Sequence, residues 1–119
     1  MVFTGNGAYW IRAEGEPNAR NPDFIVLSNS LIEARKTGTP INELRTSAVI
    51  EAFGDYWHSS RFTGKDKDAH EKEVIEYYAK AGVTCLVIWE SAIHKCPEET
   101  SKRIIEFIKY WSKWKVNLI

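Results

Sequence analysis

One short segment gathers side chains that could do chemistry at neutral pH. Residues 50–58 read Ile-Glu-Ala-Phe-Gly-Asp-Tyr-Trp-His, so Asp55 and His58 share a turn with two large aromatics, Tyr56 and Trp57. A carboxylate beside an imidazole can bind a metal ion or transfer protons. Exposed aromatics in a turn are useful where a flat group stacks on them or where they close a site. The segment therefore predicts a functional turn that needs a partner elsewhere in the chain.

Two further carboxylates are candidate partners for this turn. Asp23 directly follows Pro22 where a loop enters an apolar segment, and Glu51 lies in the apolar segment just before the turn. Because side chains alternate along a strand, either the Glu51 side chain or the backbone carbonyl of Ala52 faces Asp23. Each carboxylate also has a structural interpretation. Asp23 could accept backbone N–H groups in a loop, and Glu51 could keep an edge strand soluble.

The remaining polar candidates follow the turn. Glu71, next to His70, opens a predicted helix and either serves the site or belongs to a solvated helix start. Arg61 and Lys65 lie in a polar stretch that predicts a mobile basic loop. His58 itself is open to a purely structural role, since a single histidine carries no chemistry without neighbours.

Four apolar segments predict the strands that must position these side chains. The helix expected between the third and fourth segments makes their connection a crossover, so these two strands should be parallel. Glycine, proline and asparagine between the first two segments predict a loop. The fold class is therefore an α/β domain with a small mixed β-sheet flanked by helices. The predicted strands cover residues 8–13, 23–27, 48–53 and 83–89.

Helix signals are clearest in the second half of the chain. Asp68 is predicted to cap a helix that ends at Gly82, and Thr39 to cap a shorter helix that begins with Pro40. His94 is placed in a surface loop after the fourth strand. The predicted helices cover residues 31–34, 40–45, 68–81 and 97–115, and the inner face of the last one holds Ile104, Ile105, Phe107, Ile108 and Trp111.

The composition sets limits on the class of protein. With 119 residues, 44% of them hydrophobic, the chain is expected to form one domain with a single core. The formal net charge is zero, which argues against a domain that grips DNA by electrostatics alone. No apolar run is long enough for a membrane span, and no secretory signal is present, so a cytoplasmic location is expected. Cys85 is predicted to be a buried, reduced thiol.

Three segments resemble successive blocks of the very-short-patch-repair endonucleases. They are Asn-Pro-Asp-Phe-Ile-Val at 21–26, Phe-Gly-Asp-Tyr-Trp-His at 53–58 and Ala-Gly-Val-Thr-Cys-Leu-Val-Ile-Trp-Glu at 81–90. The Gly-Asp-Tyr-Trp-His variant looks most like the phage and intron-encoded EDxHD homing endonucleases, which share that nuclease fold. The resemblance extends from about Tyr9 to Lys95. It implies a restriction-endonuclease-like core and a Mg²⁺-dependent DNA endonuclease.

The resemblance also implies roles for individual residues. Asp23 becomes the ligand of the catalytic Mg²⁺, with the carbonyl of Ala52 completing the shell. His58 becomes the group that takes a proton from water, and Tyr56 and Trp57 match aromatics that stack on DNA bases. These roles agree with the chemistry, because phosphodiester hydrolysis needs charge neutralisation and a deprotonated water.

Other assignments follow more loosely from the same resemblance. Glu71 stands where the family has an aspartate and would orient the site through His58 or a water. Arg61 and Lys65 are assigned to DNA contacts. Further candidates are Glu51, Asp55 and Glu14.

The chain departs from the family pattern in several places. Asp55 replaces a cysteine of the family's structural zinc, so no such zinc is expected. Phe53 stands where the wider superfamily often has a catalytic lysine, which leaves the base role to His58. The family's first helix and its catalytic glutamate have no match. Either Glu14 or Glu16 substitutes for that glutamate, or residues 1–119 are the C-terminal catalytic domain of a longer DNA-binding protein, the interpretation we favour.

Two functions from different classes remain after this comparison. The first is the catalytic domain of a homing endonuclease that acts on double-stranded DNA in a bacterial or phage-infected cell, with a homodimeric parent protein for double-strand cuts. The second is a catalytically weak DNA-binding or structural relic of the same fold. An unrelated α/β interaction domain is a third and less specific interpretation.

Overall fold

A mixed β-sheet forms the centre of the computed structural model, which describes residues 1–54, 64 and 66–111. Within these residues the sheet has four strands in the order β1-β2-β3-β4. The pairs β1–β2 and β2–β3 are antiparallel, whereas β3 and β4 are parallel, which confirms the predicted crossover. The strands are β1 (Val2–Phe3), β2 (Phe24–Ile25), β3 (Ala48–Phe53) and β4 (Thr84–Trp89).

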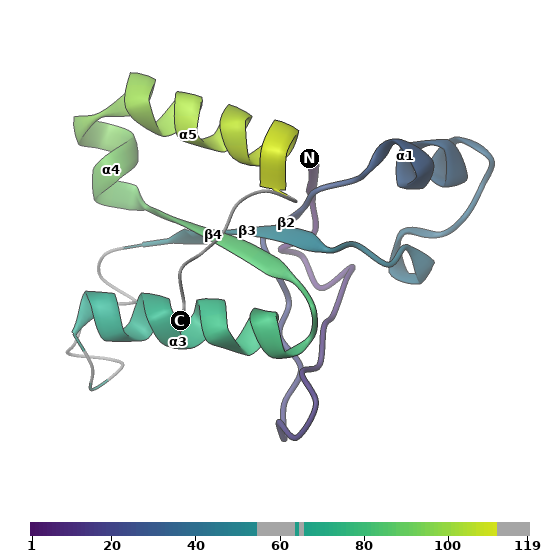
Figure 1. Cartoon of the computed structure of the whole chain (residues 1–119), viewed down its shortest axis with the longest axis horizontal. Helices are drawn as coiled ribbons and strands as arrows, with labels where there is room; N and C mark the ends of the chain where they lie inside the picture. The colour runs from purple at the N-terminus through teal and green to yellow at the C-terminus, as the bar shows by residue number, and fades with distance from the viewer. Residues whose placement is uncertain (55–63, 65, 112–119) are drawn as a thin grey trace.

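Helices cover both faces of this sheet. Figure 1 shows α3 on one face and the pair α4 and α5 on the other, whereas α1 and the 3₁₀ helix η1 project beyond one end of the sheet. The architecture is therefore the predicted α/β class, with three layers around β3 and β4. The helices are α1 (Asn29–Lys36), η1 (Ile41–Glu43), α3 (Lys67–Lys80), α4 (Glu90–Lys95) and α5 (Pro97–Tyr110).

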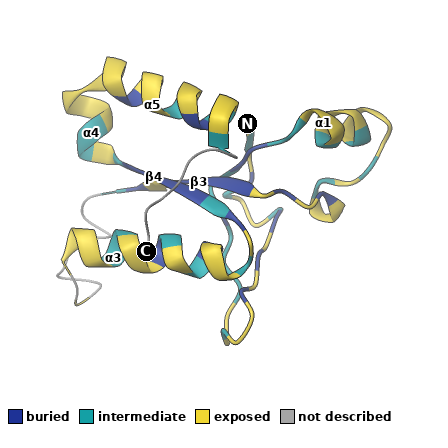
Figure 2. Ribbon diagram, viewed as in Figure 1, coloured by how far each residue is buried: buried dark blue, intermediate teal, exposed yellow. Residues whose placement is uncertain are grey.

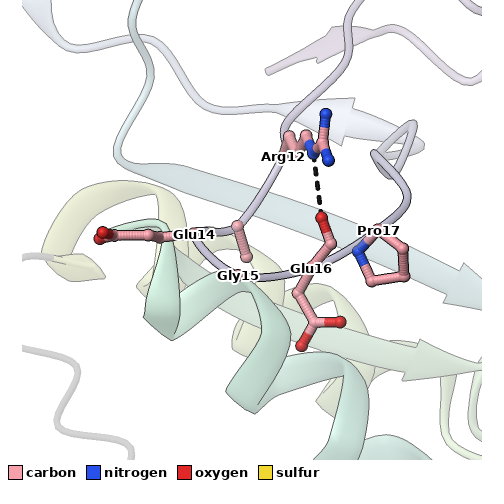
Figure 3. Close-up of a pocket in the computed structure, with 6 residues that line it drawn as sticks. Arg12, Glu14, Gly15, Glu16 and Pro17 are labelled. Carbon is pink, nitrogen blue, oxygen red and sulfur yellow. Dashed lines mark hydrogen bonds between the residues drawn. The ribbon is translucent and has the colours of Figure 1, made fainter.

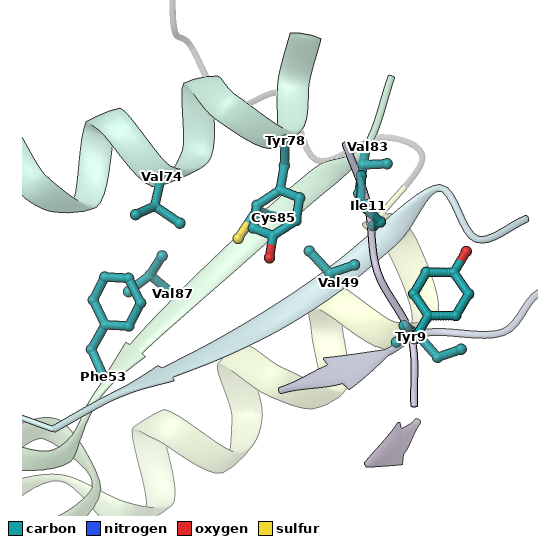
Figure 4. Packing of buried hydrophobic residues seen from close by; sticks show 10 residues of the cluster. Tyr9, Ile11, Val49, Phe53, Val74, Tyr78, Val83, Cys85 and Val87 are labelled. Carbon is teal, nitrogen blue, oxygen red and sulfur yellow. The ribbon is translucent and has the colours of Figure 1, made fainter. Parts of the chain in front are cut away.

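The core is divided by the sheet into two clusters, because alternate residues of β3 and β4 point to opposite faces. Figure 2 shows both strands almost entirely buried between the helices. The cluster under α3, drawn in Figure 4, contains Tyr9, Ile11, Ile25, Val49, Phe53, Val74, Tyr78, Val83, Cys85 and Val87. The cluster under α5 contains Val26, Ala48, Ile50, Leu86, Ile88 and Phe107.

The helix α3 ends as the sequence predicts. Gly82 has φ of 74°, a left-handed conformation that favours glycine. The N–H of Gly82 donates to the carbonyl of Ala79 at 3.0 Å, and the N–H of Val83 donates to that of Tyr78 at 2.9 Å. These two bonds form a Schellman motif, which closes the helix and turns the chain directly into β4.

The strand predictions were wrong at the N-terminal edge. Residues 8–13 form no strand; Ile11 makes an isolated bridge with Arg20 instead. The edge strand is β1, which the sequence analysis did not predict, and β2 covers only two of the five residues expected. Segments this short carry too few side chains to show a period.

Several helix predictions also need correction. Asp66, not Asp68, caps α3, and its carboxylate accepts the N–H of Ala69 at 2.7 Å. The segment 40–45 holds only a 3₁₀ turn whose N-cap is Pro40 rather than Thr39. His94 lies in the unpredicted helix α4, although it is exposed as expected.

The last helix is confirmed in outline. Phe107 is fully buried and Ile104, Ile108 and Trp111 pack beside it, but Ile105 is 51% exposed rather than on the inner face. None of the helices in the described ranges has the length and apolar character to cross a membrane.

Candidate functional site

The two carboxylates Asp23 and Glu51 meet where β2 and β3 separate. Phe24 pairs with Ile50 in the register, which places the preceding Asp23 beside Glu51. The N–H of Asp23 donates to Oε1 of Glu51 at 2.9 Å, and the N–H of Ala52 donates to Oδ2 of Asp23 at 2.8 Å. The two side chains thus accept backbone donors that the ladder no longer satisfies. Of the two alternatives left open by the sequence, the structure places the Glu51 carboxylate against Asp23.

The backbone around Asp23 is fixed by the N-terminal segment. The carbonyl of Asp23 accepts the N–H of Thr4 at 2.7 Å and that of Gly5 at 3.1 Å. The hydroxyl of Thr4, which is fully buried, donates to the carbonyl of Pro22 at 2.8 Å. The Asp23 carboxylate therefore projects from a backbone held on both sides, an arrangement suited to fixed ligand geometry.

Glu51 is an unusual carboxylate because it is only 5% exposed on a central strand. Burial, and after it the neighbouring charge of Asp23, raise the pKa of Glu51 to about 7. Arg20 opposes this shift, since its Nη2 lies 3.7 Å from Oε2 of Glu51. The structure thus holds two carboxylates together with incomplete compensation by cations, a pair that an added cation would stabilise.

Arg20 and Tyr78 complete the surroundings of Glu51, and the sequence analysis assigned neither to the site. In Figure 4 the ring of Tyr78 extends from α3 toward the sheet. Burial and the charge of Glu51 raise the pKa of the Tyr78 phenol. Among the described residues, the buried Nε of Arg20 and the hydroxyl of Tyr78 have no hydrogen-bond partner of normal geometry. Arg20 could have been suspected from its place just ahead of Pro22, but Tyr78 looks like an ordinary apolar-stripe residue.

The donor atoms present fit a hard, oxygen-binding cation. Mg²⁺ typically takes one or two carboxylates and keeps several waters. Asp23 and Glu51 offer two carboxylates that each accept one backbone N–H and keep further lone pairs. Within the described ranges, no group of three or more histidine, cysteine, aspartate or glutamate side chains could hold a metal ion. Within the described ranges, the side chains available to such a site are therefore the two carboxylates of Asp23 and Glu51.

Glu71 lies in a different environment from the Asp23–Glu51 pair. It is half-buried in the first half of α3, and burial raises its pKa, whereas Arg103 of α5 and a hydrogen bond with Trp89 lower it. The neighbouring His70 stacks on Phe53, with ring centroids 5.2 Å apart and planes at 24°. Trp89 contacts the same Phe53 ring edge-on at 5.1 Å. Glu71 and His70 are thus part of the packed end of β3 and β4, not a fully solvated helix start.

Most of the predicted functional turn, residues 55–58, lies outside the described ranges. The residues predicted for proton transfer and DNA contact lie outside the described ranges, namely Asp55, Tyr56, Trp57, His58, Arg61 and Lys65. Phe53, at the position where the resemblance would lead one to expect a lysine, is 1% exposed in the core under α3. The described chain thus brings together Asp23, Glu51 and the Ala52 backbone.

The two candidates for an upstream catalytic glutamate lie on the loop drawn in Figure 3, where they line a shallow pocket with Arg12 and Pro17. Arg12 Nε donates to the carbonyl of Glu16 at 2.9 Å, which closes the loop. The Glu16 carboxylate lies 3.0 Å from Nζ of Lys80, the last residue of α3. Glu14 is exposed. Glu16 is therefore bound at the far end of α3, whereas Asp23 is bound near the end of β3.

Comparison with known proteins does not assign the chain to a family. No family model, curated protein or solved structure matches it.

Proposed function

We propose that this chain is a metal-dependent endonuclease domain that hydrolyses phosphodiester bonds in double-stranded DNA, of the homing-endonuclease kind. A restriction-endonuclease-like core of the very-short-patch-repair type is part of the proposal. The observation that carries it is the position of the buried Glu51 carboxylate, which accepts the backbone N–H of Asp23 at the point where β2 and β3 separate. A buried acid in a sheet is costly, so the burial of Glu51 beside a second carboxylate, Asp23, favours a functional role.

Each residue has a role in this proposal. Asp23 and Glu51 would hold Mg²⁺ with the Ala52 carbonyl, and the bound ion would neutralise phosphate charge and lower the pKa of a water. His58 would accept the proton from that water, with Glu71 orienting it. Contacts to DNA would come from Tyr56, Trp57, Arg61 and Lys65.

The test is cleavage of supercoiled plasmid in Mg²⁺ by the full chain. We expect nicking or linearisation that EDTA abolishes, and loss of activity in Asp23→Asn and Glu51→Gln, which keep the shape but remove the charge. His58→Ala should slow cleavage by about 10²- to 10⁴-fold, the usual contribution of a general base. Glu43→Gln is the matched control, since Glu43 is an exposed carboxylate on η1. This variant should cleave DNA like the wild type.

A weakly active DNA-binding relic is the competing function. Two observations favour it. Within the described residues, no third acidic or histidine ligand accompanies the carboxylate pair. Phe53 is buried in the core at the position where the resemblance would lead one to expect a catalytic lysine. That alternative predicts DNA binding without cleavage at any Mg²⁺ concentration. Cleavage that persists in both Asp23→Asn and Glu51→Gln would refute the site itself.

A further inference from the structure

Phe3 is an exposed aromatic residue at the edge of the sheet. It is the last residue of β1, and its side chain is 56% exposed. Its partner in the register is Phe24, and the two rings meet edge-on with centroids 5.5 Å apart and planes at 66°. Contact with Phe24 holds the Phe3 ring in place but leaves more than half of the residue open to solvent.

Gly5 shows how close this ring lies to the carboxylate pair. A Cβ placed on Gly5 would lie 2.7 Å from Cε1 of Phe3 and 3.1 Å from Oδ1 of Asp23. The ring and the carboxylate oxygen therefore flank one point, and a side chain at position 5 would displace one of them. The absence of a side chain at Gly5 thus lets the edge of the Phe3 ring and the Asp23 carboxylate approach the same point.

The ring and the carboxylate are also coupled through the backbone. The same two residues that follow Phe3, Thr4 and Gly5, donate their N–H groups to the carbonyl of Asp23. The Thr4 side chain binds the carbonyl of Pro22. Phe3 thus has a fixed position relative to the proposed metal ligand, unlike an aromatic on an unattached chain end.

We propose that Phe3 stacks on a nucleobase next to the phosphodiester bond that is positioned at Asp23. The proposal rests on the proposed endonuclease function and adds a DNA contact from β1. Aromatic faces bind bases through stacking, which tolerates any sequence because every base has a π-face. A base adjoins its own phosphate, so an aromatic face beside a phosphate-binding carboxylate site is within reach of such a base.

The proposal is tested by equilibrium binding of fluorescein-labelled 30-nucleotide DNA, single-stranded and duplex, with Ca²⁺ replacing Mg²⁺ to suppress cleavage. Phe3→Leu keeps the apolar contact with Phe24 but lacks a flat ring, and should weaken binding about 5- to 150-fold. Phe3→Trp should bind at least as tightly as the wild type, and its added tryptophan fluorescence should be quenched by DNA. Tyr110→Leu is the control, since Tyr110 on α5 is also 56% exposed. This variant should bind DNA as tightly as the wild type.

The outcomes separate this inference from the function on which it rests. Wild-type plasmid cleavage together with unchanged binding by Phe3→Leu would overturn the stacking role and leave the endonuclease intact. A wild type that neither binds nor cleaves DNA would overturn both. Thermal unfolding of each variant identifies any binding loss that comes from unfolding, and Phe3→Trp, which keeps an aromatic ring, then decides the question through its quenching.

Discussion

The two faces of the sheet differ sharply in chemistry. Under α5 the buried cluster is entirely aliphatic or aromatic, with Phe107 at its centre. Under α3 the buried cluster contains two tyrosine hydroxyls and a thiol, and Glu51 lies buried on the same side of β3. The same two strands supply both faces by alternation, so the difference arises from the side chains and not from the backbone.

This difference separates stability from chemistry. An apolar face gains free energy from burial at little cost, whereas each buried polar group costs free energy unless it is fully paired. The α3 face retains an acid with a raised pKa and a tyrosine hydroxyl without a hydrogen-bond partner of normal geometry. We interpret the α5 face as the part that stabilises the fold and the α3 face as the part that carries the site.

The largest expected effect tests the α5 face. Phe107→Ala should reduce the free energy of unfolding by about 3–5 kcal/mol, because it opens a cavity in a cluster where Phe107 is fully buried. Denaturant unfolding at pH 7 measures this. Ile105→Ala on the same helix is the control, since its 51% exposure should limit the loss to about 0.5 kcal/mol. Equal losses in the two variants would contradict the assignment of the face.

The next effect belongs to Glu51 and depends on pH. Its pKa is raised from 4.5 to about 7, so the folded state binds a proton more tightly than the unfolded state. Stability from this group is present below pH 4.5 and is lost as the pH rises through 7, by an amount on the order of 3 kcal/mol. In EDTA, the wild type should therefore lose stability relative to Glu51→Gln as the pH rises from 5 to 8. A pH-independent difference would show that Glu51 is not buried as described.

A pair of tyrosines on the α3 face gives a smaller and sharper test. The Tyr9 hydroxyl donates to the carbonyl of Leu44 and accepts the N–H of Thr46, whereas the Tyr78 hydroxyl has no hydrogen-bond partner of normal geometry in the described chain. Tyr9→Phe should cost about 1–3 kcal/mol, because it leaves buried backbone groups unpaired. Tyr78→Phe should change stability by less than about 1 kcal/mol. Thermal unfolding compares the two, and a reversed order would contradict the hydrogen-bond assignment.

The smallest effect concerns the surface at the end of α3. Lys80 and Glu16 form an ion pair at 3.0 Å, with side-chain exposures of 58% and 31%. Lys80→Gln should lower stability by about 0.2–1 kcal/mol, and salt should reduce this loss. Unfolding at low and high ionic strength measures it. A loss comparable with that of Phe107→Ala would show that this loop, and not the α5 face, dominates stability.

The long, regular elements could be predicted from the sequence because their patterns extend over many residues. The strands predicted at 48–53 and 83–89 are observed at 48–53 and 84–89, with a helix between them as predicted, and their parallel order follows from the crossover. The segment 8–13 shows the limit of such arguments. Tyr9, Ile11 and Ala13 are buried and Trp10 and Arg12 are exposed, so the alternation is real. The segment is nevertheless an extended loop with one isolated bridge. Alternation shows which side chains are buried, but it does not show whether the backbone pairs with another strand.

The candidate site could be predicted only in part. Strand alternation correctly limited the choice at Asp23 to Glu51 or the Ala52 carbonyl, and the structure shows the Glu51 carboxylate there. Tyr78 and Phe3 could not be placed, since each reaches the site through tertiary contacts with a distant segment. Sequence spacing gives no information on such contacts.

The bonds from Thr4 and Gly5 to Asp23 also have a dynamic consequence. The strand β1 that leads into them is two residues long and lies at the edge of the sheet, where local opening costs least. Detachment of this edge would free the carbonyl of Asp23 while the β3–β4 core stays folded. The amides of Thr4 and Gly5 should then exchange with solvent earlier than those of β3, and the proposed cleavage activity should disappear below the global unfolding temperature.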